Sequence, residues 1–147
     1  MSPLCTLKMK NAGVISLSLC VFLLACADRR PEIERAMKRY DRFILQVDAD
    51  SIASCFAPDG RLGKLGGRDS IRAFLKTFNE VNVLEQASTS ETVVIDGDAA
   101  QQEGHYRQKV ILEGDTIVGT GKYTATWVWD ARAGWLLKKM ETFPDKE

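Results

Sequence analysis

The stretch GKYTATWVWD, residues 121–130, decides the fold because its side chains alternate in character along the chain. Every second position holds an aromatic ring or a small apolar side chain: Tyr123, Ala125, Trp127 and Trp129. Residues two apart share one face of a strand, so the pattern predicts a strand with a row of rings on one side. Residues 130–134 predict a turn, after which 135–140 return as a second strand. If Trp129 lies opposite Trp135, Trp127 faces Leu137 and three tryptophans share one wall.

Three helices are predicted upstream of this wall. Apolar side chains recur at three- and four-residue spacing over 32–47, which is typical of a long amphipathic helix. Asp50 is the expected N-cap of a second, short helix through Phe56, followed by a turn over 57–60. Residues 61–67 indicate a short strand or loop. A third helix opens at Gly67 and carries an apolar stripe: Ile71, Phe74, Leu75 and Phe78.

From Val81 onward the apolar period changes to two. Strands are expected over 91–95 and 99–112, then in the aromatic stretch and its return, with Asp96-Gly-Asp98 and Glu113-Gly-Asp115 as turns. The predicted order is three helices followed by a four-stranded antiparallel meander. The fold class is therefore α+β, with the helices on one face of the sheet.

The turns also assign side chains to faces. A two-residue turn at Gly97-Asp98 places Glu91 on the side of Tyr106, and one at Gly114-Asp115 places Tyr106 opposite Tyr123. A slip of one residue would invert these faces. The predicted inner face holds Tyr106, Gln108, Tyr123, Trp127, Trp129 and Trp135, with Glu91, Lys139 and Glu141 as polar members.

The N-terminal residues 1–25 are typical of an export signal. Lys8 precedes Lys10, and both precede an apolar run over 12–25. This run is too short to span a bilayer, since a spanning helix needs about 20 apolar residues. The run ends in Leu23-Leu-Ala-Cys26, which resembles the lipobox of bacterial lipoproteins. The resemblance implies lipidation of Cys26, a membrane partner, and a tether over 26–31 before a domain over 32–147. Ordinary cleavage nearby, with Cys26 incidental, is the alternative.

This N-terminus predicts a location on the periplasmic side of a bacterial cell envelope. Ala27 follows the cysteine where Asp would favour retention in the inner membrane, so the outer membrane is expected. A soluble periplasmic or secreted protein is the alternative.

Composition excludes several classes of function. The 147 residues carry a net charge of zero and show no stripe of Lys and Arg with interleaved aromatics, so no nucleic-acid partner is expected. His105 is the only histidine, which leaves no histidine-based metal cluster or serine triad, and no metal or cofactor is expected. His105 itself is expected on the solvated outer face, with a dimer-interface or catalytic role as the alternative. Cys55 is expected to be a buried apolar residue.

Several motifs in this order resemble the SnoaL-like and ketosteroid-isomerase-like branch of the nuclear-transport-factor-two fold. They are the long first helix, Phe56-Ala-Pro-Asp-Gly, Gly67-Arg-Asp-Ser-Ile-Arg-Ala-Phe, Gly104-His-Tyr, Gly121-Lys-Tyr, Trp127-Val-Trp-Asp and Gly134-Trp-Leu-Leu. The resemblance implies a strongly curved sheet wrapped around the helices as a half-open cone. It also implies an apolar pocket and a homodimer formed through the outer face of the sheet.

The resemblance further implies where isomerase groups would stand. The helix tyrosine of ketosteroid isomerases corresponds to Phe43, and the proton-moving Asp to about Lys64. No acid lies between Lys122 and Trp129. Phe43 cannot donate a hydrogen bond, and Lys64 cannot act as a base at its usual pKa of about 10.4. These positions predict that the isomerase mechanism is absent.

Two functions follow as hypotheses. The first is a module that binds a small apolar ligand, or a protein partner, without catalysis. Its expected lining is Tyr40, Phe43, Phe56, Phe74, Tyr106, Gln108, Tyr123, Trp127 and Trp129. A cone packed solid is the alternative for these rings. The second is an isomerase, dehydratase or hydrolase in which a cavity carboxylate such as Glu91 is the general base.

Overall fold

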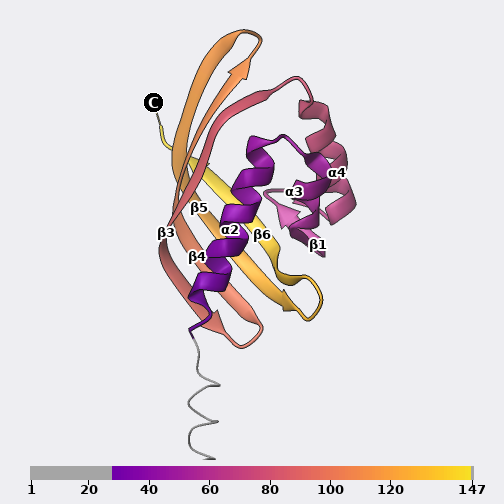
Figure 1. Ribbon diagram of the computed structural model, residues 1–147, viewed down its shortest axis with the longest axis vertical. Helices are drawn as coiled ribbons and strands as arrows, with labels where there is room; N and C mark the ends of the chain where they lie inside the picture. The colour runs from indigo at the N-terminus through magenta and orange to yellow at the C-terminus, as the bar shows by residue number, and fades with distance from the viewer. Residues whose placement is uncertain (1–27, 147) are drawn as a thin grey trace, which may run out of the picture.

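The computed structural model describes residues 28–146, and Figure 1 shows their arrangement. The export signal over 1–25 and the lipidation site Cys26 lie outside the described residues. In chain order the elements are α2 (Arg30–Leu45), α3 (Ala49–Ser54), β1 (Phe56–Leu62), β2 (Leu65–Gly66), α4 (Arg68–Leu75), the 3₁₀ helix η1 (Lys76–Phe78), β3 (Asn82–Asp96), β4 (Ala99–Leu112), β5 (Asp115–Asp130) and β6 (Gly134–Pro144). Within 28–146 no helix is both long enough and apolar enough to span a membrane.

One curved sheet of six strands runs in the order β2-β1-β6-β5-β4-β3. Strands β3 to β6 form the antiparallel meander that the period of two predicts. α2 packs against β3 and β6 on the concave side, with α3 and α4 beside it (Figure 1). The chain therefore has an α+β fold in which helices cover one face of a curved sheet.

The sheet is larger than predicted, because residues 56–62 form a strand rather than a helix end and a turn. β1 pairs parallel with β6, which makes the sheet mixed. The pairing is irregular between Phe56 and Arg61, around Pro58, which cannot donate to the ladder. Gly60 lies so close to β6 that an added Cβ would sit 2.8 Å from the carbonyl oxygen of Leu137. The Pro and Gly that resemble a turn here shape an irregular strand.

The helix boundaries differ slightly from those predicted. α2 ends at Leu45, because Val47 has a φ of +53°, outside the helical region. The N-cap of α3 is Asp48 rather than Asp50: its carboxylate accepts from the Ser51 backbone N–H at 3.0 Å and from the Ser51 hydroxyl at 2.6 Å. A cap reaches the N–H three residues ahead, and Asp48 has that spacing to Ser51.

The tryptophan wall is as predicted. Trp129 pairs with Trp135, and Trp127 pairs with Leu137. Each tryptophan nitrogen within the core finds an acceptor: Trp127 Nε1 donates to Gln102 Oε1 at 3.0 Å, and Trp135 Nε1 donates to Glu32 Oε2 at 3.0 Å. The side chains at this end of the concave face belong to the buried hydrophobic core.

Candidate functional site

At the other end of the concave face, α2 and the sheet enclose a hollow with two compartments. The apolar compartment has a volume of about 330 Å³ and is lined by Tyr40, Ile44, Val47, Ala49, Ile52, Leu75, Phe78, Val81, Val83, Gln108, Val110 and Leu112. The polar compartment has a volume of about 220 Å³ and is lined by Tyr40, Ile44, Gln86, Ser88, Tyr106, Gln108, Tyr123, Met140 and Thr142. Tyr40, Ile44 and Gln108 line both, so they stand at the boundary between the two.

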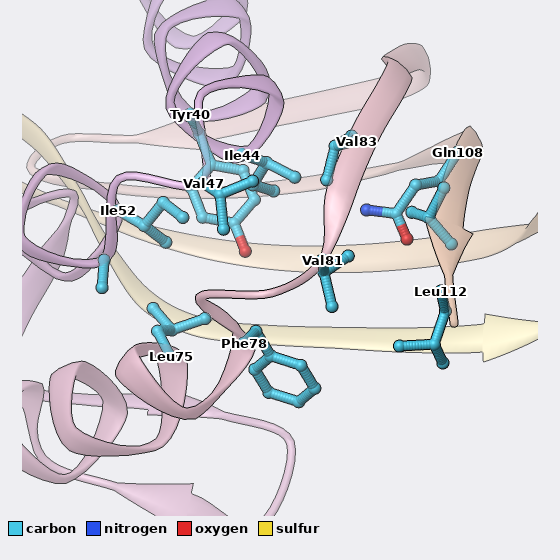
Figure 2. Close-up of a pocket in the computed structure, with 12 residues that line it drawn as sticks. Tyr40, Ile44, Val47, Ile52, Leu75, Phe78, Val81, Val83, Gln108 and Leu112 are labelled. Carbon is cyan, nitrogen blue, oxygen red and sulfur yellow. The ribbon is translucent and has the colours of Figure 1, made fainter. Parts of the chain in front are cut away.

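Local structure explains the lining of the apolar compartment. The stripe of α2 that begins at Ile33 reaches the compartment through Tyr40 and Ile44, one turn apart. α4 and η1 close it from the side with Leu75 and Phe78. Figure 2 shows the Tyr40 hydroxyl and the Gln108 amide reaching into the space that these apolar side chains enclose. An apolar cavity with few polar groups is the usual form of a small-molecule site.

Two Gly-x-Tyr motifs on neighbouring strands explain why the polar compartment is open. In the register of β4 and β5, Gly104 lies opposite Tyr123, and Tyr106 lies opposite Gly121. An added Cβ at Gly104 would sit 2.9 Å from Tyr123 Cε1, and one at Gly121 would sit 2.9 Å from Tyr106 Cε1. Each ring therefore lies over a glycine on the next strand. The rings lie along the sheet and leave room beneath α2.

This register corrects the predicted one. The turn residues are Glu113-Gly114 rather than Gly114-Asp115, since Leu112 pairs with Asp115. Tyr106 is therefore shifted by two residues from Tyr123. A shift of two keeps both rings on the inner face, as predicted. Pairing each tyrosine with a glycine was the sequence signal that could have given the correct register.

A buried carboxylate organises the polar side of the hollow. Asp41, 7% exposed, accepts from Gln86 Nε2 at 2.9 Å, from the Ser88 hydroxyl at 2.8 Å and from the Ser88 backbone N–H at 2.8 Å. Gln86 Oε1 in turn accepts from Gln108 Nε2 at 3.0 Å. Sequence reasoning missed Asp41, Gln86 and Ser88. The acid at 41, adjacent to the apolar stripe of α2, was the one available signal.

The tyrosines of the hollow are held in their neutral form. Burial is the largest cause of the raised pKa of Tyr40, and the nearby Cys55 and Asp41 add to it. Burial likewise raises the pKa of Tyr123. Burial also raises the pKa of Tyr106. Among residues 28–146, the buried Tyr123 hydroxyl has no hydrogen-bond partner. The phenols can therefore donate hydrogen bonds at neutral pH.

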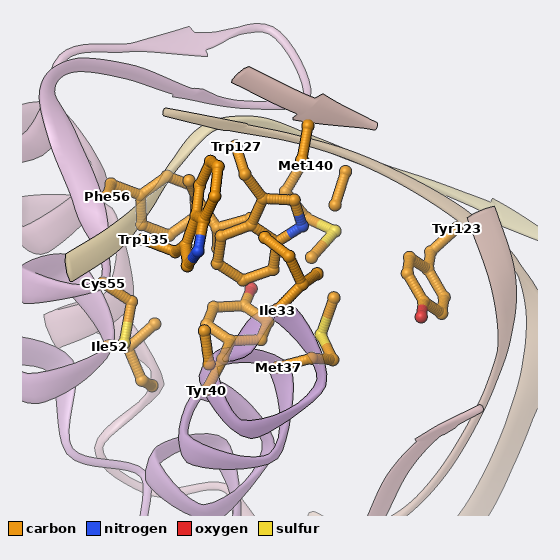
Figure 3. Close-up of a cluster of buried hydrophobic side chains, with 14 of the residues drawn as sticks. Ile33, Met37, Tyr40, Ile52, Cys55, Phe56, Tyr123, Trp127, Trp135 and Met140 are labelled. Atoms are coloured by element: carbon orange, nitrogen blue, oxygen red, sulfur yellow. The ribbon is translucent and has the colours of Figure 1, made fainter. Parts of the chain in front are cut away.

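Four of the nine residues expected to bind a ligand line the hollow: Tyr40, Tyr106, Gln108 and Tyr123. The other five do not. Phe56 and Trp127 are fully buried in the core, where Figure 3 shows them beside Trp135 and Tyr40, apart from Tyr123. Phe43 packs at the edge of that core. Phe74 is 41% exposed and its ring packs against Phe78, and Trp129 lines a separate surface groove.

The structure also corrects the position assigned to the helix phenol. Phe43 lines neither compartment, and Lys64 lines a different hollow beside β6. Tyr40, one turn before Phe43, is the residue that α2 presents to the cavity. The helix therefore does place a phenol hydroxyl in the hollow.

Glu91 was predicted on the inner face, and this is wrong. The pairing of β3 with β4 shifts between Ser90 and Thr92, so Glu91 is the extra residue of a β-bulge and turns outward. There Glu91 Oε1 lies 2.7 Å from Nε2 of His105, and both side chains are about half exposed. A second bulge, in β6, turns Lys139 and Glu141 outward, where they form an ion pair at 2.9 Å.

No ionisable acid or base other than tyrosine lines either compartment in the part of the chain that the structure describes. Nor do three His, Cys, Asp or Glu side chains within 28–146 come together as metal ligands would. The polar groups available to a ligand are hydroxyls and amides.

The SnoaL-like domain family matches residues 26–141, most of the chain. The chain belongs to the SnoaL-like domain family. No curated relative matches it in sequence.

Solved structures similar to this SnoaL-like domain share its fold at low identity. A ketosteroid isomerase-like protein from Erwinia carotovora is 16% identical, with a TM-score of 0.72, over 82% of this chain and 98% of the other. A Catenulispora acidiphila protein in complex with S-DNPA is 21% identical, with a TM-score of 0.66, over 78% and 92%. A nuclear transport factor 2-like superfamily protein from Salmonella enterica is 18% identical, with a TM-score of 0.66, over 80% and 91%.

Proposed function

We propose that this SnoaL-like domain binds a small, neutral, largely apolar molecule in the hollow between α2 and strands β3 and β4. One observation carries the proposal: Tyr40 is 7% exposed, yet its hydroxyl points into an apolar compartment of about 330 Å³ (Figure 2). In the adjoining polar compartment the Tyr123 hydroxyl is buried without a hydrogen-bond partner among residues 28–146. A buried hydroxyl without a partner costs about 1–3 kcal/mol, which a ligand that bonds to it would offset.

The chemistry of the lining favours binding over proton transfer. A general base must titrate near the working pH and reach the proton that it removes. The carboxylate previously considered for that role, Glu91, lies on the outer face, and the oxygens of Asp41 are occupied by Gln86 and Ser88. The solved structure from Catenulispora acidiphila in complex with S-DNPA, which shares this fold, supports a binding role.

The binding proposal is tested by filling the hollow. Val83 lines the apolar compartment at 9% exposure, whereas Val94 on the same strand is 65% exposed and lies outside both compartments. We expect Val83→Phe to weaken binding of the probe 2-naphthol at least about tenfold in calorimetric titration of the full chain, since the ring occupies the probe's space. Val94→Phe is the matched control and should leave affinity unchanged. Equal affinity in both folded variants would contradict the proposal.

We further propose that the domain is exported and anchored through Cys26, on the periplasmic side of a bacterial envelope. The support is the apolar run over 12–25 and the lipobox-like sequence that ends at Cys26. Cys26→Ser should move the chain from the membrane fraction to the soluble fraction. Cys20→Ser, within the signal itself, is the control and should remain with the membrane. A membrane-bound Cys26→Ser chain would refute anchoring at this residue.

A further inference from the structure

The hydrogen bonds around Asp41 fix the direction of two glutamine amides in series. The Asp41 carboxylate accepts all three of its hydrogen bonds, and Gln86 is turned so that its Nε2 donates one of them. Gln86 Oε1 then faces Gln108, its cross-strand neighbour, which must turn its own Nε2 toward it. The amide directions thus follow from the partners, which is the proper basis for orienting a glutamine.

The orientation of the Gln108 amide determines which polar atom the hollow offers to a ligand. Gln108 lines both compartments, and one N–H of its Nε2 donates to Gln86, so the amide is held in one direction and its Oε1 is the acceptor that it offers to a ligand. Tyr40 also lines both compartments, and its hydroxyl reaches into the apolar one from the side opposite Gln108 (Figure 2). The site therefore offers one fixed acceptor and one phenol hydroxyl that donates.

We infer that Asp41 acts as a specificity-determining residue through this relay, and that the hollow selects apolar molecules that end in a neutral hydroxyl. Such a hydroxyl donates to Gln108 Oε1 and accepts from Tyr40. A ketone or ether of the same shape can accept from Tyr40 but leaves Gln108 Oε1 unpaired in an apolar setting. This inference rests on the proposed ligand-binding function and adds the ligand's polar group to it.

Asp41→Asn inverts the relay in this account. The Asn amide keeps an oxygen for the Ser88 backbone N–H and places its NH₂ toward Gln86. Gln86 then turns its Oε1 toward residue 41 and its Nε2 toward Gln108. Gln108 accepts that bond with Oε1 and presents its Nε2 to the hollow, where the fixed acceptor has become a donor.

The test compares three probes that share one naphthalene ring in calorimetric titrations of the full chain: naphthalene, 2-naphthol and 2-acetylnaphthalene. For the natural chain we expect 2-naphthol to bind about tenfold more tightly than 2-acetylnaphthalene, the factor expected from one hydrogen bond. In Asp41→Asn the order should reverse. Asp96→Asn is the matched control, because Asp96 is an exposed residue of β3 that lines neither compartment, and this variant should keep the natural order of affinities.

A second variant keeps the inference testable if Asp41→Asn does not fold. Gln86→Leu breaks the relay, so the Gln108 amide can turn either way and the ratio between the two polar probes should fall to about one. A folded Asp41→Asn or Gln86→Leu chain that keeps the natural preference would overturn the relay while leaving ligand binding intact. Failure of all three probes to bind the natural chain would overturn the binding function itself, and the relay with it.

Discussion

Two glutamines on the inner face of β4 divide the molecule into a closed end and an open end. Gln102 uses both ends of its amide within the protein, accepting from Trp127 Nε1 at 3.0 Å and donating to the Ser90 hydroxyl at 2.6 Å. Gln108, six residues on, donates to Gln86 and turns its oxygen toward the hollow. The same side chain on the same strand therefore completes a core at one end and leaves an acceptor free at the other.

The aromatic residues of the two ends differ in the same way. Trp127 and Trp135 at the closed end have buried nitrogens with acceptors, and the Arg29 guanidinium lies 4.7 Å from the Trp135 ring centroid. At the open end the Tyr123 hydroxyl is buried without a partner in the described chain, and the Tyr40 hydroxyl faces the hollow. Satisfied polar groups mark the structural end, and unsatisfied ones mark the end where a ligand is expected.

The largest loss of stability is expected for a substitution at the closed end. Trp127→Ala removes a side chain that is 1% exposed and leaves the Gln102 oxygen without its donor. Loss of a buried tryptophan should lower the free energy of unfolding by about 3–5 kcal/mol, measured by urea denaturation. A loss below about 1 kcal/mol would mean that the wall is loosely packed and that the contrast between the ends is false.

A matched pair of glutamine variants sharpens the contrast. Gln102→Leu buries the Trp127 N–H without an acceptor and should cost about 1–3 kcal/mol of unfolding free energy. Gln108→Leu leaves Gln86 Oε1 beside the hollow and should cost less than about 1 kcal/mol, while weakening 2-naphthol binding. Urea denaturation and titration measure both. Equal stability losses would remove the distinction between a closed and an open glutamine.

Alkaline pH probes the tyrosine end. Burial raises the pKa of Tyr40 in the folded chain, so the unfolded chain loses its proton first as pH rises past the ordinary value of about 10. The stability from the protonated phenol is therefore fully present below pH 10 and falls above it. One tyrosine lowers the free energy of unfolding by at most about 1.4 kcal/mol per pH unit. Above pH 10 the free energy of unfolding of Tyr40→Phe should fall less than that of the natural chain. Parallel pH profiles of the two chains would contradict a raised pKa for Tyr40 in the folded state.

The smallest change in stability and affinity is expected for a substitution on the outer face of the sheet, away from both ends. Glu91→Gln alters an exposed pair with His105 on the outer face, and exposed pairs contribute little. The free energy of unfolding should change by less than about 0.5 kcal/mol, and the affinity for 2-naphthol should not change. A loss of affinity above about fivefold, in a chain that folds normally, would place Glu91 in the functional machinery after all.

The sequence predicted the elements that rest on periodicity. The alternation from Tyr123 to Trp129 gave the inner face of β5, and the stripe beginning at Ile33 gave α2. The two-residue turn at Gly97-Asp98 gave the pairing of β3 with β4 next to that turn, since Asp96 pairs with Ala99. Periodicity works here because each element buries one face.

The sequence could not predict features set by single residues. The bulge at Glu91 reverses the faces of β3 on either side of it, and no residue type there marks it. Pro58 and Gly60 resemble a turn, whereas pairing with β6 holds them in a strand. Tyr40 and Phe43 lie on the same face of α2, about one turn apart along its axis. The three- and four-residue spacing predicts that face, but it does not predict which turn reaches the hollow.

The most direct test of the central claim is a crystal structure of the full chain grown with 2-naphthol. We predict the naphthalene ring in the apolar compartment, among Leu75, Phe78 and Val83, with its hydroxyl between Tyr40 and Gln108 Oε1. A structure in which the probe lies outside the hollow, or in which Leu75 and Phe78 fill the compartment, would contradict the account.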